Sequence, residues 1–199
     1  MSRRATARLF VAAEVPGSAR EQLAGWARSA ASAAQPAGAP RPMRLLDPEN
    51  LHLTLCFLGS RPVEEIAAIG STLSACAADV GELSVGAPLW LPRARPRSLA
   101  VAIHDDGGAL ADLQAAVTGA IAESTGWEPE RRRFRAHVTV ARTRGRPAAG
   151  FSAGGGACLP ATPQLRFSAE SLTLYRSWLS PAGAAYEIVA TCALSPSAP

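Results

Sequence analysis

The chain has 199 residues, and 48% of them are hydrophobic, which is enough apolar material for a packed core and excludes a wholly disordered chain. All 20 basic residues are arginine, and with 16 acidic residues they give a formal net charge of +4. This excess has two interpretations: the amino-acid usage of an arginine-rich and alanine-rich genome, or a weak positive field that favours an anionic ligand.

Short sequence features argue against several further classes of protein. The four cysteines are widely spaced and form no C-x-x-C pair, which argues against a zinc ribbon or a thioredoxin-like redox site. The apolar run at 9–13 is cut by Glu14 and Pro16, so it is too short for a signal peptide or a membrane span. We therefore expect a cytoplasmic protein without membrane contact, with a monomer as the default state.

The first half is predicted to contain three strands and two helices. Ser18 and Glu21 have the spacing of a capping box that opens a helix, and Gly59 is predicted to end the strand that holds His52. Pro62 suits the first turn of the second helix. The predicted elements are strand 8–15, a helix from 18 through 26, loop 35–42, strand 43–46, turn 47–50, strand 51–58 and a helix whose buried face is Ile66, Ile69, Leu73 and Cys76.

The second half repeats this order less clearly. A helix is predicted at 109–125, with Gly126 as its C-terminal cap and with an apolar stripe of Leu110, Leu113, Val117 and Ile121. The other predicted elements are strands 83–85 and 98–103, a strand that holds His137, a flexible surface loop at 145–163, and strands 165–175 and 185–192 joined by a turn at 181–183. Strands and helices mix without strict β-α-β alternation, so the predicted fold class is α+β, as one domain or as two halves around a shared cleft.

Two runs of four residues share one pattern: a histidine, an apolar residue, a threonine and another apolar residue. They are His52-Leu53-Thr54-Leu55 and His137-Val138-Thr139-Val140. Side chains alternate between the two faces of a strand, so the histidine and the threonine of each run share a face while the apolar residues enter the core. Each run therefore presents one imidazole and one hydroxyl side by side.

The same alternation predicts the neighbours of the two histidines. Cys56 falls on the face of His52, and Arg135 falls on the face of His137, where its guanidinium is placed to bind a phosphate. Arg142 has the opposite parity and reaches the cleft only if the strand ends or bulges after Val140.

Two histidines and two threonines of this kind suit the cleavage of a phosphate ester. An imidazole with an ordinary pKa of about 6.5 exists in both protonation states near neutral pH, so one histidine accepts a proton from water and the other gives one to the leaving oxygen. The hydroxyls of Thr54 and Thr139 donate hydrogen bonds to the non-bridging oxygens. This chemistry needs no metal, and no further His or Cys cluster supplies the ligands for one.

Simpler interpretations stand beside this one. A single H-x-T-x run occurs often by chance, and a histidine in an apolar strand is usually a packed or surface residue, but two of only three histidines occur in this setting. His104 is predicted to be a solvated loop residue. Cys56 is expected to be a packed strand residue rather than a nucleophile. The arginine run at 131–135 suits either nucleic-acid phosphates or bulk solvent.

Four segments, in this order along nearly the whole chain, resemble the 2H phosphoesterases. They are RLFVA at 8–12, ENLHLTLCFLG at 49–59, FRAHVTVAR at 134–142 and LYRS at 174–177, and they are most similar to the RNA 2',3'-cyclic phosphodiesterases, also described as 2'-5' RNA ligase-like proteins. The resemblance implies one α+β domain, 1–199, with two pseudo-symmetric lobes of antiparallel sheet and helices. Each lobe then contributes one H-x-T-x strand to a central cleft.

The resemblance also implies an activity. It is hydrolysis of a 2',3'-cyclic phosphate at an RNA end to a 2'-phosphate without metal or cofactor, with His52 as proton donor and His137 as proton acceptor. Expected partners are RNA ends or oligonucleotides that carry this phosphate, including tRNA fragments, or small cyclic nucleotides. The sequence departs from the family at Ala136, where proline is common, and at Cys56, where a polar residue is common.

Two other functions remain as alternatives. The same groups acting in reverse would ligate 2'-5' RNA ends, and a comparison of joined with hydrolysed product separates this activity from hydrolysis. A non-catalytic RNA-binding or nucleotide-binding module would show salt-sensitive binding without turnover.

Overall fold

A computed structural model describes residues 5–34, 43–143, 159–180 and 183–194. The strands are β1 (Thr6–Glu14), β2 (Met43–Leu45), β3 (His52–Pro62), β4 (Leu83–Leu91), β5 (Ser98–His104), β6 (His137–Thr143), β7 (Arg166–Phe167), β8 (Ser171–Ser180) and β9 (Gly183–Ala193). The helices are α1 (Gly17–Ala33), α2 (Ile66–Cys76) and α3 (Ala109–Thr125), with short 3-10 turns η1 (Pro48–Asn50) and η2 (Val63–Glu65). The predicted loop 35–42 and most of the predicted loop 145–163 lie outside the described residues.

Within these residues all strands join one antiparallel sheet. Its order is β7-β4-β5-β6-β3-β1-β8-β9, and β2 also pairs with β6. The two H-x-T-x strands, β3 and β6, are therefore neighbours in the middle of the sheet. One half contains β3, β1, β8 and β9, and the other contains β6, β5, β4 and β7.

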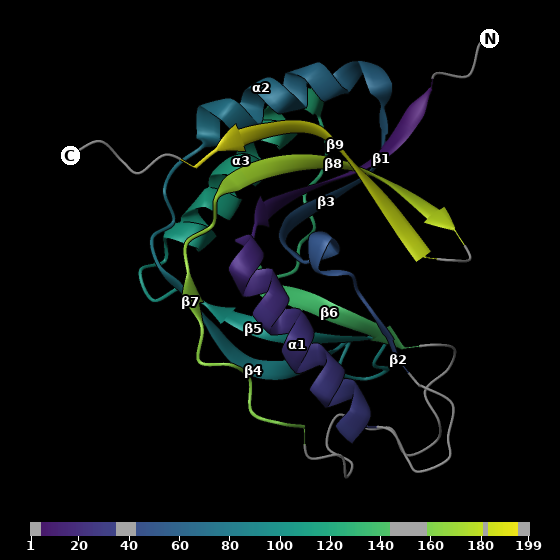
Figure 1. Cartoon of the computed structure of the whole chain (residues 1–199). Coiled ribbons are helices and arrows are strands. Elements are labelled where there is room, and N and C mark those ends of the chain that lie inside the picture. The colour runs from purple at the N-terminus through teal and green to yellow at the C-terminus, as the bar shows by residue number, and fades with distance from the viewer. Residues whose placement is uncertain (1–4, 35–42, 144–158, 181–182, 195–199) are drawn as a thin grey trace.

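The helices cross between these two halves. Helix α1 follows β1 in sequence but packs against β2 and β6 of the other half, whereas α3 follows β5 and packs with α2 on the half that contains β3, β8 and β9. Figure 1 shows α2 and α3 together beside β8 and β9, and α1 in front of β4, β5 and β6. This exchange gives the two halves a common core, because buried residues of all three helices belong to one cluster.

Helix α3 confirms the predicted apolar stripe. Its buried residues are Leu110, Leu113, Val117 and Ile121. Gly126 follows the helix with a positive φ of 64°, and its N–H donates to the carbonyl of Ala122 at 2.9 Å. A C-terminal cap of this kind favours glycine because a Cβ atom strains the left-handed conformation.

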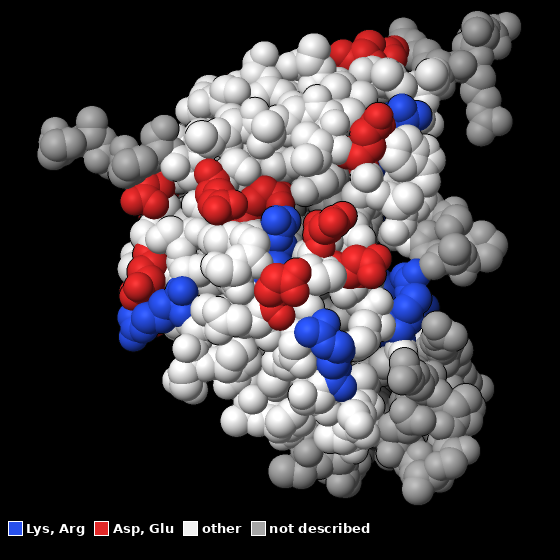
Figure 2. Space-filling model, in the orientation of Figure 1, with Lys and Arg blue, Asp and Glu red and all other residues white. Residues whose placement is uncertain are grey.

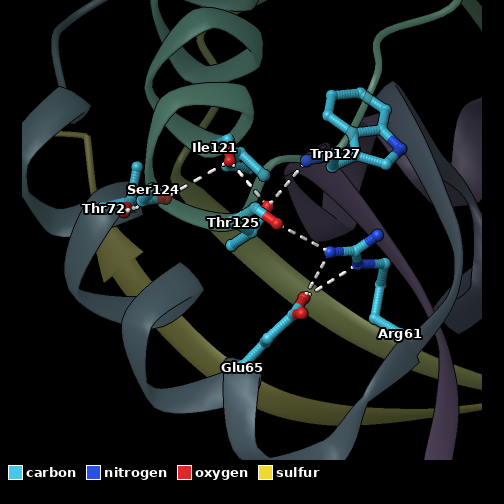
Figure 3. Close-up of polar contacts among 7 residues, drawn as sticks. All are labelled: Arg61, Glu65, Thr72, Ile121, Ser124, Thr125 and Trp127. Atoms are coloured by element: carbon cyan, nitrogen blue, oxygen red, sulfur yellow. Dashed lines mark hydrogen bonds and ion pairs between the residues drawn. The ribbon is translucent and has the colours of Figure 1, made fainter.

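Arg61, near the end of β3, ties this strand to the last turn of α3 and to the turn that leads into α2 (Figure 3). Its guanidinium donates to the carbonyl of Thr125 at 3.0 Å and forms an ion pair with Glu65 at 2.7 Å. A cation at the last carbonyls of α3 also interacts favourably with the negative end of the helix dipole. Both Arg61 and Glu65 are mostly buried, with side-chain exposures of 19% and 23%.

Replacing Arg61 by glutamine is expected to lower the free energy of unfolding by about 1–2 kcal/mol, because a charge-assisted hydrogen bond and a partly buried ion pair are lost together. Urea unfolding measures the change. Arg28→Gln, on the exposed surface of α1, is the matched control and should leave stability within about 0.5 kcal/mol. Equal stability of the two variants would contradict the role given to Arg61.

Several predicted boundaries are wrong. Helix α1 begins at Gly17, after Pro16, and has no side-chain cap, so Ser18 and Glu21 do not form a capping box. Strand β3 continues through Gly59, which adopts a φ of +71° beside a shift in the pairing register with β1. A bulge absorbs the irregularity that the sequence suggested as an end.

The predicted strand 165–175 is also divided in two. Its first part, β7, pairs with β4 at one edge of the sheet, and its second part, β8, pairs with β1 in the other half. The chain must leave the sheet at 168–170 to pass from one half to the other. The N–H of Glu170 donates there to the carbonyl of Glu14 at 3.1 Å, which fixes the crossing.

Candidate active site

The two H-x-T-x runs lie directly opposite one another. Strands β3 and β6 are antiparallel, and Leu53 is paired with Val138. Continuing this register places His52 opposite Thr139 and Thr54 opposite His137. Directly opposed side chains on one face have Cβ atoms about 4.5–5.5 Å apart. The sheet therefore brings the two histidines and the two threonines into one cluster.

A cavity of about 450 Å³ lies over this cluster. Its wall includes all four residues of the cluster, and they come from the middle of the sheet. The other lining residues are Arg8, Leu9, Phe10, Arg44, Leu46, Asn50, Phe57, Gly59, Arg142, Ser177, Ala184 and Tyr186. Each half of the sheet thus contributes one imidazole, one hydroxyl and at least one arginine.

Each central strand bulges at the third residue after its histidine. In β3 the register against β1 skips Leu55, and in β6 the register against β5 skips Val140. Each bulge leaves two consecutive residues buried, and the alternation resumes with the opposite parity. The two H-x-T-x strands therefore share an irregularity as well as a motif.

These bulges change which neighbours face the cavity. Cys56 turns into the core, so its predicted place on the face of His52 is wrong, and Phe57 lines the cavity instead. Burial raises the pKa of the Cys56 thiol to about 12, which agrees with a packed residue. In β6 the bulge brings Arg142 to the cavity wall. The sequence predicted this position only for a strand that ends or bulges after Val140.

Arg135 lies in a different place from the one that strand parity predicted. Strand β6 begins at His137, so the alternation does not extend back to Arg135, whose side chain is exposed and is not part of the cavity wall. Its backbone carbonyl instead accepts a hydrogen bond from Nδ1 of His137 at 2.7 Å. A role of the Arg135 guanidinium in phosphate binding stays a prediction.

Both imidazoles are held by a carbonyl two residues earlier in the chain. His137 donates to Arg135, and the ring of His52 makes the equivalent hydrogen bond with the backbone of Asn50. A carbonyl only accepts, so Nδ1 of His137 carries the hydrogen and Nε2 is left to exchange a proton with a ligand. The local geometry thus sets the tautomer that acid or base catalysis requires.

An aromatic cluster surrounds His52. Its ring centroid lies 5.0 Å from that of Phe10, 5.8 Å from that of Tyr175 and 5.5 Å from that of Tyr186, in an edge arrangement with the last. Burial is the largest cause that lowers the pKa of His52 to about 4, and electrostatic interactions with Arg142 and His137 act in the same direction, while the hydrogen bond with Asn50 opposes the change. In the free protein His52 is therefore neutral at pH 7.

The depressed pKa of His52 predicts a stability profile. The pKa of His52 in the folded chain, about 4, lies below the ordinary value of 6.5. Between these two pH values the unfolded chain therefore binds a proton that the folded chain does not bind. The free energy of unfolding should fall as the pH drops from about 6.5 to about 4, by at most about 1.4 kcal/mol per pH unit. Urea unfolding of wild type and His52→Gln at several pH values isolates this contribution. His104→Gln is the control. Parallel stability profiles of wild type and His52→Gln would refute the lowered pKa of His52.

The sequence did not predict some of the residues at this site. Glu14 lies opposite His52 in the pairing of β1 with β3, accepts a hydrogen bond from the hydroxyl of Tyr175 at 2.7 Å, and lies 3.7 Å from Arg20. Burial raises the pKa of Glu14 although both partners act against it. The hydrogen bond between Glu14 and Tyr175 holds the Tyr175 ring against His52. Its only sequence signal is a carboxylate that ends an otherwise apolar strand.

The charged residues of the cavity wall all have one sign. The wall has three arginines, Arg8, Arg44 and Arg142, and no acidic residue among those described. By contrast, Figure 2 shows one face of the molecule on which acidic and basic side chains lie side by side. Positive potential is therefore concentrated at the cavity although the net charge is small, and this arrangement favours an anionic ligand.

The described residues contain no group of three or more His, Cys, Asp or Glu side chains placed to hold a metal ion. None of their helices combines the length and the apolar character needed to cross a bilayer.

Comparisons with known proteins agree with the geometry. Residues 14–88, which include the first H-x-T-x strand, match the family model described as LigT like Phosphoesterase. An RNA 2',3'-cyclic phosphodiesterase of Aeropyrum pernix is 32% identical over 105 residues, which cover 52% of this chain and 59% of that protein. The matched stretch therefore spans less than two thirds of the relative.

Solved structures show a similarity of fold over nearly the whole chain. TT0787 of Thermus thermophilus superposes with a TM-score of 0.73 at 24% identity, over 96% of this chain and all of that one. Escherichia coli LigT, crystallised with 3'-AMP, gives a TM-score of 0.72 at 22% identity over 96% and 99% of the two chains. The predicted α+β fold, as found in the LigT structures, is thereby confirmed.

Proposed function

The chain has the LigT fold and matches the model of the LigT-like phosphoesterases over residues 14–88. We propose that it is a phosphodiesterase that hydrolyses 2',3'-cyclic phosphates at RNA ends. The observation that carries this proposal is the antiparallel pairing of β3 with β6, which opposes two His/Thr pairs across one cavity. The named relative from Aeropyrum pernix supports the same reaction at modest identity.

The reaction needs one proton acceptor and one proton donor on opposite sides of phosphorus. His137 accepts a proton from water, whose oxygen forms the new bond to phosphorus. The bond from phosphorus to the 3' oxygen breaks, and His52 gives that oxygen a proton. The products are a 2'-phosphate and a free 3' hydroxyl, and both histidines return to their starting state when a proton passes back through solvent.

His52 acquires its proton in the presence of the substrate. Its pKa of about 4 belongs to the free protein. A phosphate anion a few ångströms away favours the charged imidazolium and raises the pKa by roughly 1–3 units. Arg142, on the same wall, limits this rise because its charge opposes that of the imidazolium. The donor is thus charged chiefly when there is an anion to cleave.

Thr54 and Thr139 bind the non-bridging oxygens. Each hydroxyl lies opposite the histidine of the other strand, so one threonine accompanies each proton-transfer step. Negative charge grows on these oxygens as water attacks, and fixed donors in a partly desolvated cavity stabilise it without reorganisation. The two hydroxyls supply donors for these oxygens and the two imidazoles supply the proton transfers, so we propose a metal-independent reaction.

Aromatic side chains support a nucleoside as the substrate. Phe10, Phe57 and Tyr186 line the cavity beside His52, and the Phe57 ring is 53% exposed. An exposed aromatic face beside a phosphate site is the usual platform for an unpaired base. We therefore propose that the terminal base stacks at this end of the cavity.

A cyclic-phosphate oligonucleotide tests the proposed function. Phosphorus NMR should show conversion of the cyclic phosphate to a 2'-phosphate, with the same rate in EDTA. A 3'-phosphate product, or a rate that EDTA abolishes, would contradict the mechanism. Binding without turnover of any cyclic phosphate would indicate the non-catalytic alternative.

A further inference from the structure

The cavity wall contains a pair of arginines that have no proton-transfer role in the acid/base chemistry. Strand β3 leaves the edge of β6 beyond the Leu53–Val138 pair, and β2 takes its place against the second half of β6. In that pairing Arg44 lies directly opposite Arg142. Both residues line the cavity.

Two opposed guanidiniums favour an anion between them. Directly opposed residues have Cβ atoms about 4.5–5.5 Å apart, and like charges in such pairs repel. Within the described part of the chain Arg142 has no ion-pair partner, and no acidic residue lines the cavity. A phosphate that accepts hydrogen bonds from both guanidinium forks replaces this repulsion by attraction.

The position of the pair relative to the histidines indicates which phosphate it meets. Beyond Thr139 the chain of β6 bulges at Val140, and Arg142 is the next residue that faces the cavity. One alternation along a strand spans about 7 Å. That step is comparable to the separation of neighbouring phosphates along one nucleic-acid strand. The aromatic platform with Phe57 belongs to β3 and β1, in the other half of the sheet.

We propose that Arg44 and Arg142 form a second phosphate subsite, which binds the phosphate on the 5' side of the terminal nucleoside while the cyclic phosphate lies between the histidines. This inference rests on the proposed function. It defines the preferred substrate as a nucleoside 2',3'-cyclic phosphate that also carries a 5' phosphate group. A terminal 5' monophosphate and an internal phosphodiester share the chemistry that the pair recognises.

Four substrates test the subsite. They are adenosine 2',3'-cyclic phosphate, its 5'-phosphorylated form, the dinucleotide ApA with a terminal 2',3'-cyclic phosphate, and the same dinucleotide with an uncharged methylphosphonate linkage. For wild type, kcat/KM should be about 10- to 100-fold higher for the two substrates with a charged 5' phosphate, as expected for charge-assisted hydrogen bonds. The preference should shrink as salt rises from about 50 to about 200 mM.

The variant Arg44→Gln identifies the side chain responsible. The readout is the ratio of kcat/KM for charged and uncharged substrates, which is insensitive to the amount of folded enzyme. The ratio should fall to within about threefold of one in Arg44→Gln, keep part of its value in Arg44→Lys, and stay at the wild-type value in Arg28→Gln, an exposed arginine on α1.

Several results would overturn the subsite. They are equal wild-type kcat/KM for all four substrates, a preference for ApA that the methylphosphonate form retains, and a preference that survives Arg44→Gln. A gain limited to ApA, without one for the 5'-phosphorylated mononucleotide, would place the added contact on the second nucleoside and would also overturn it. Failure to hydrolyse any of the four substrates would refute the proposed function itself.

Discussion

Replacing His137 by alanine is expected to lower kcat/KM for a cyclic-phosphate oligonucleotide by about 100- to 10,000-fold, because one step of general acid/base catalysis is lost. The His137 ring is oriented by the carbonyl of Arg135, and its removal leaves the aromatic cluster around His52 intact. His52→Ala should cause a loss of the same order. The double variant should be little worse than either single one, since the two groups act on one transition state.

The control for both variants is His104→Ala. His104 is exposed at the end of β5 and does not line the cavity, so this variant should keep wild-type turnover. Circular dichroism and urea unfolding show whether each variant is folded. His52→Gln serves as a second variant if removal of the ring disturbs the surrounding aromatic residues. Wild-type turnover by folded His137→Ala and His52→Ala would refute two-histidine catalysis.

Replacing Thr54 or Thr139 by valine is expected to lower kcat by about 100- to 1,000-fold, the usual cost of one donor to a developing oxyanion. Valine keeps the branched shape and the strand preference of threonine, so the change removes the hydroxyl with little effect on packing. A donor that acts in the transition state lowers kcat and kcat/KM together. Steady-state kinetics on the same oligonucleotide measures both.

Thr143→Val is the matched control for the threonine variants. Thr143 lies on the same strand as Thr139 but outside the cavity wall, where its hydroxyl donates to the carbonyl of Arg97 at 3.3 Å. It should change stability slightly and leave kcat unchanged. A rise in KM without a fall in kcat for Thr54→Val and Thr139→Val would show that the hydroxyls bind the ground state only.

Local patterns predicted the parts of the fold that local forces form. Helix α3 has the predicted bounds and the predicted buried stripe, because a period of three to four apolar residues defines one helical face without reference to the rest of the chain. The start of α1 failed for the opposite reason. Pro16 and Gly17 open that helix, and a Ser-x-x-Glu spacing is no evidence that the side-chain hydrogen bonds of a cap form.

Strand parity predicted the site only as far as the first bulge. It placed each histidine with its threonine correctly, because two residues of regular strand separate them. It failed at Cys56, since the extra residue Leu55 reverses the alternation, and it missed Phe57 for the same reason. A bulge depends on how the partner strand pairs, so the four residues H-x-T-x by themselves do not predict it.

The sequence by itself determined the chemical groups of this protein: two histidines, two threonines, the core that surrounds them and the family they resemble. Only the tertiary structure decided that β3 and β6 are neighbours, that Arg44 lies opposite Arg142, and that aromatic rings from β1, β8 and β9 surround His52. The physical reason is distance along the chain. Motif and periodicity report residues a few positions apart, whereas the cavity is built by strand pairings between residues tens to more than a hundred positions apart.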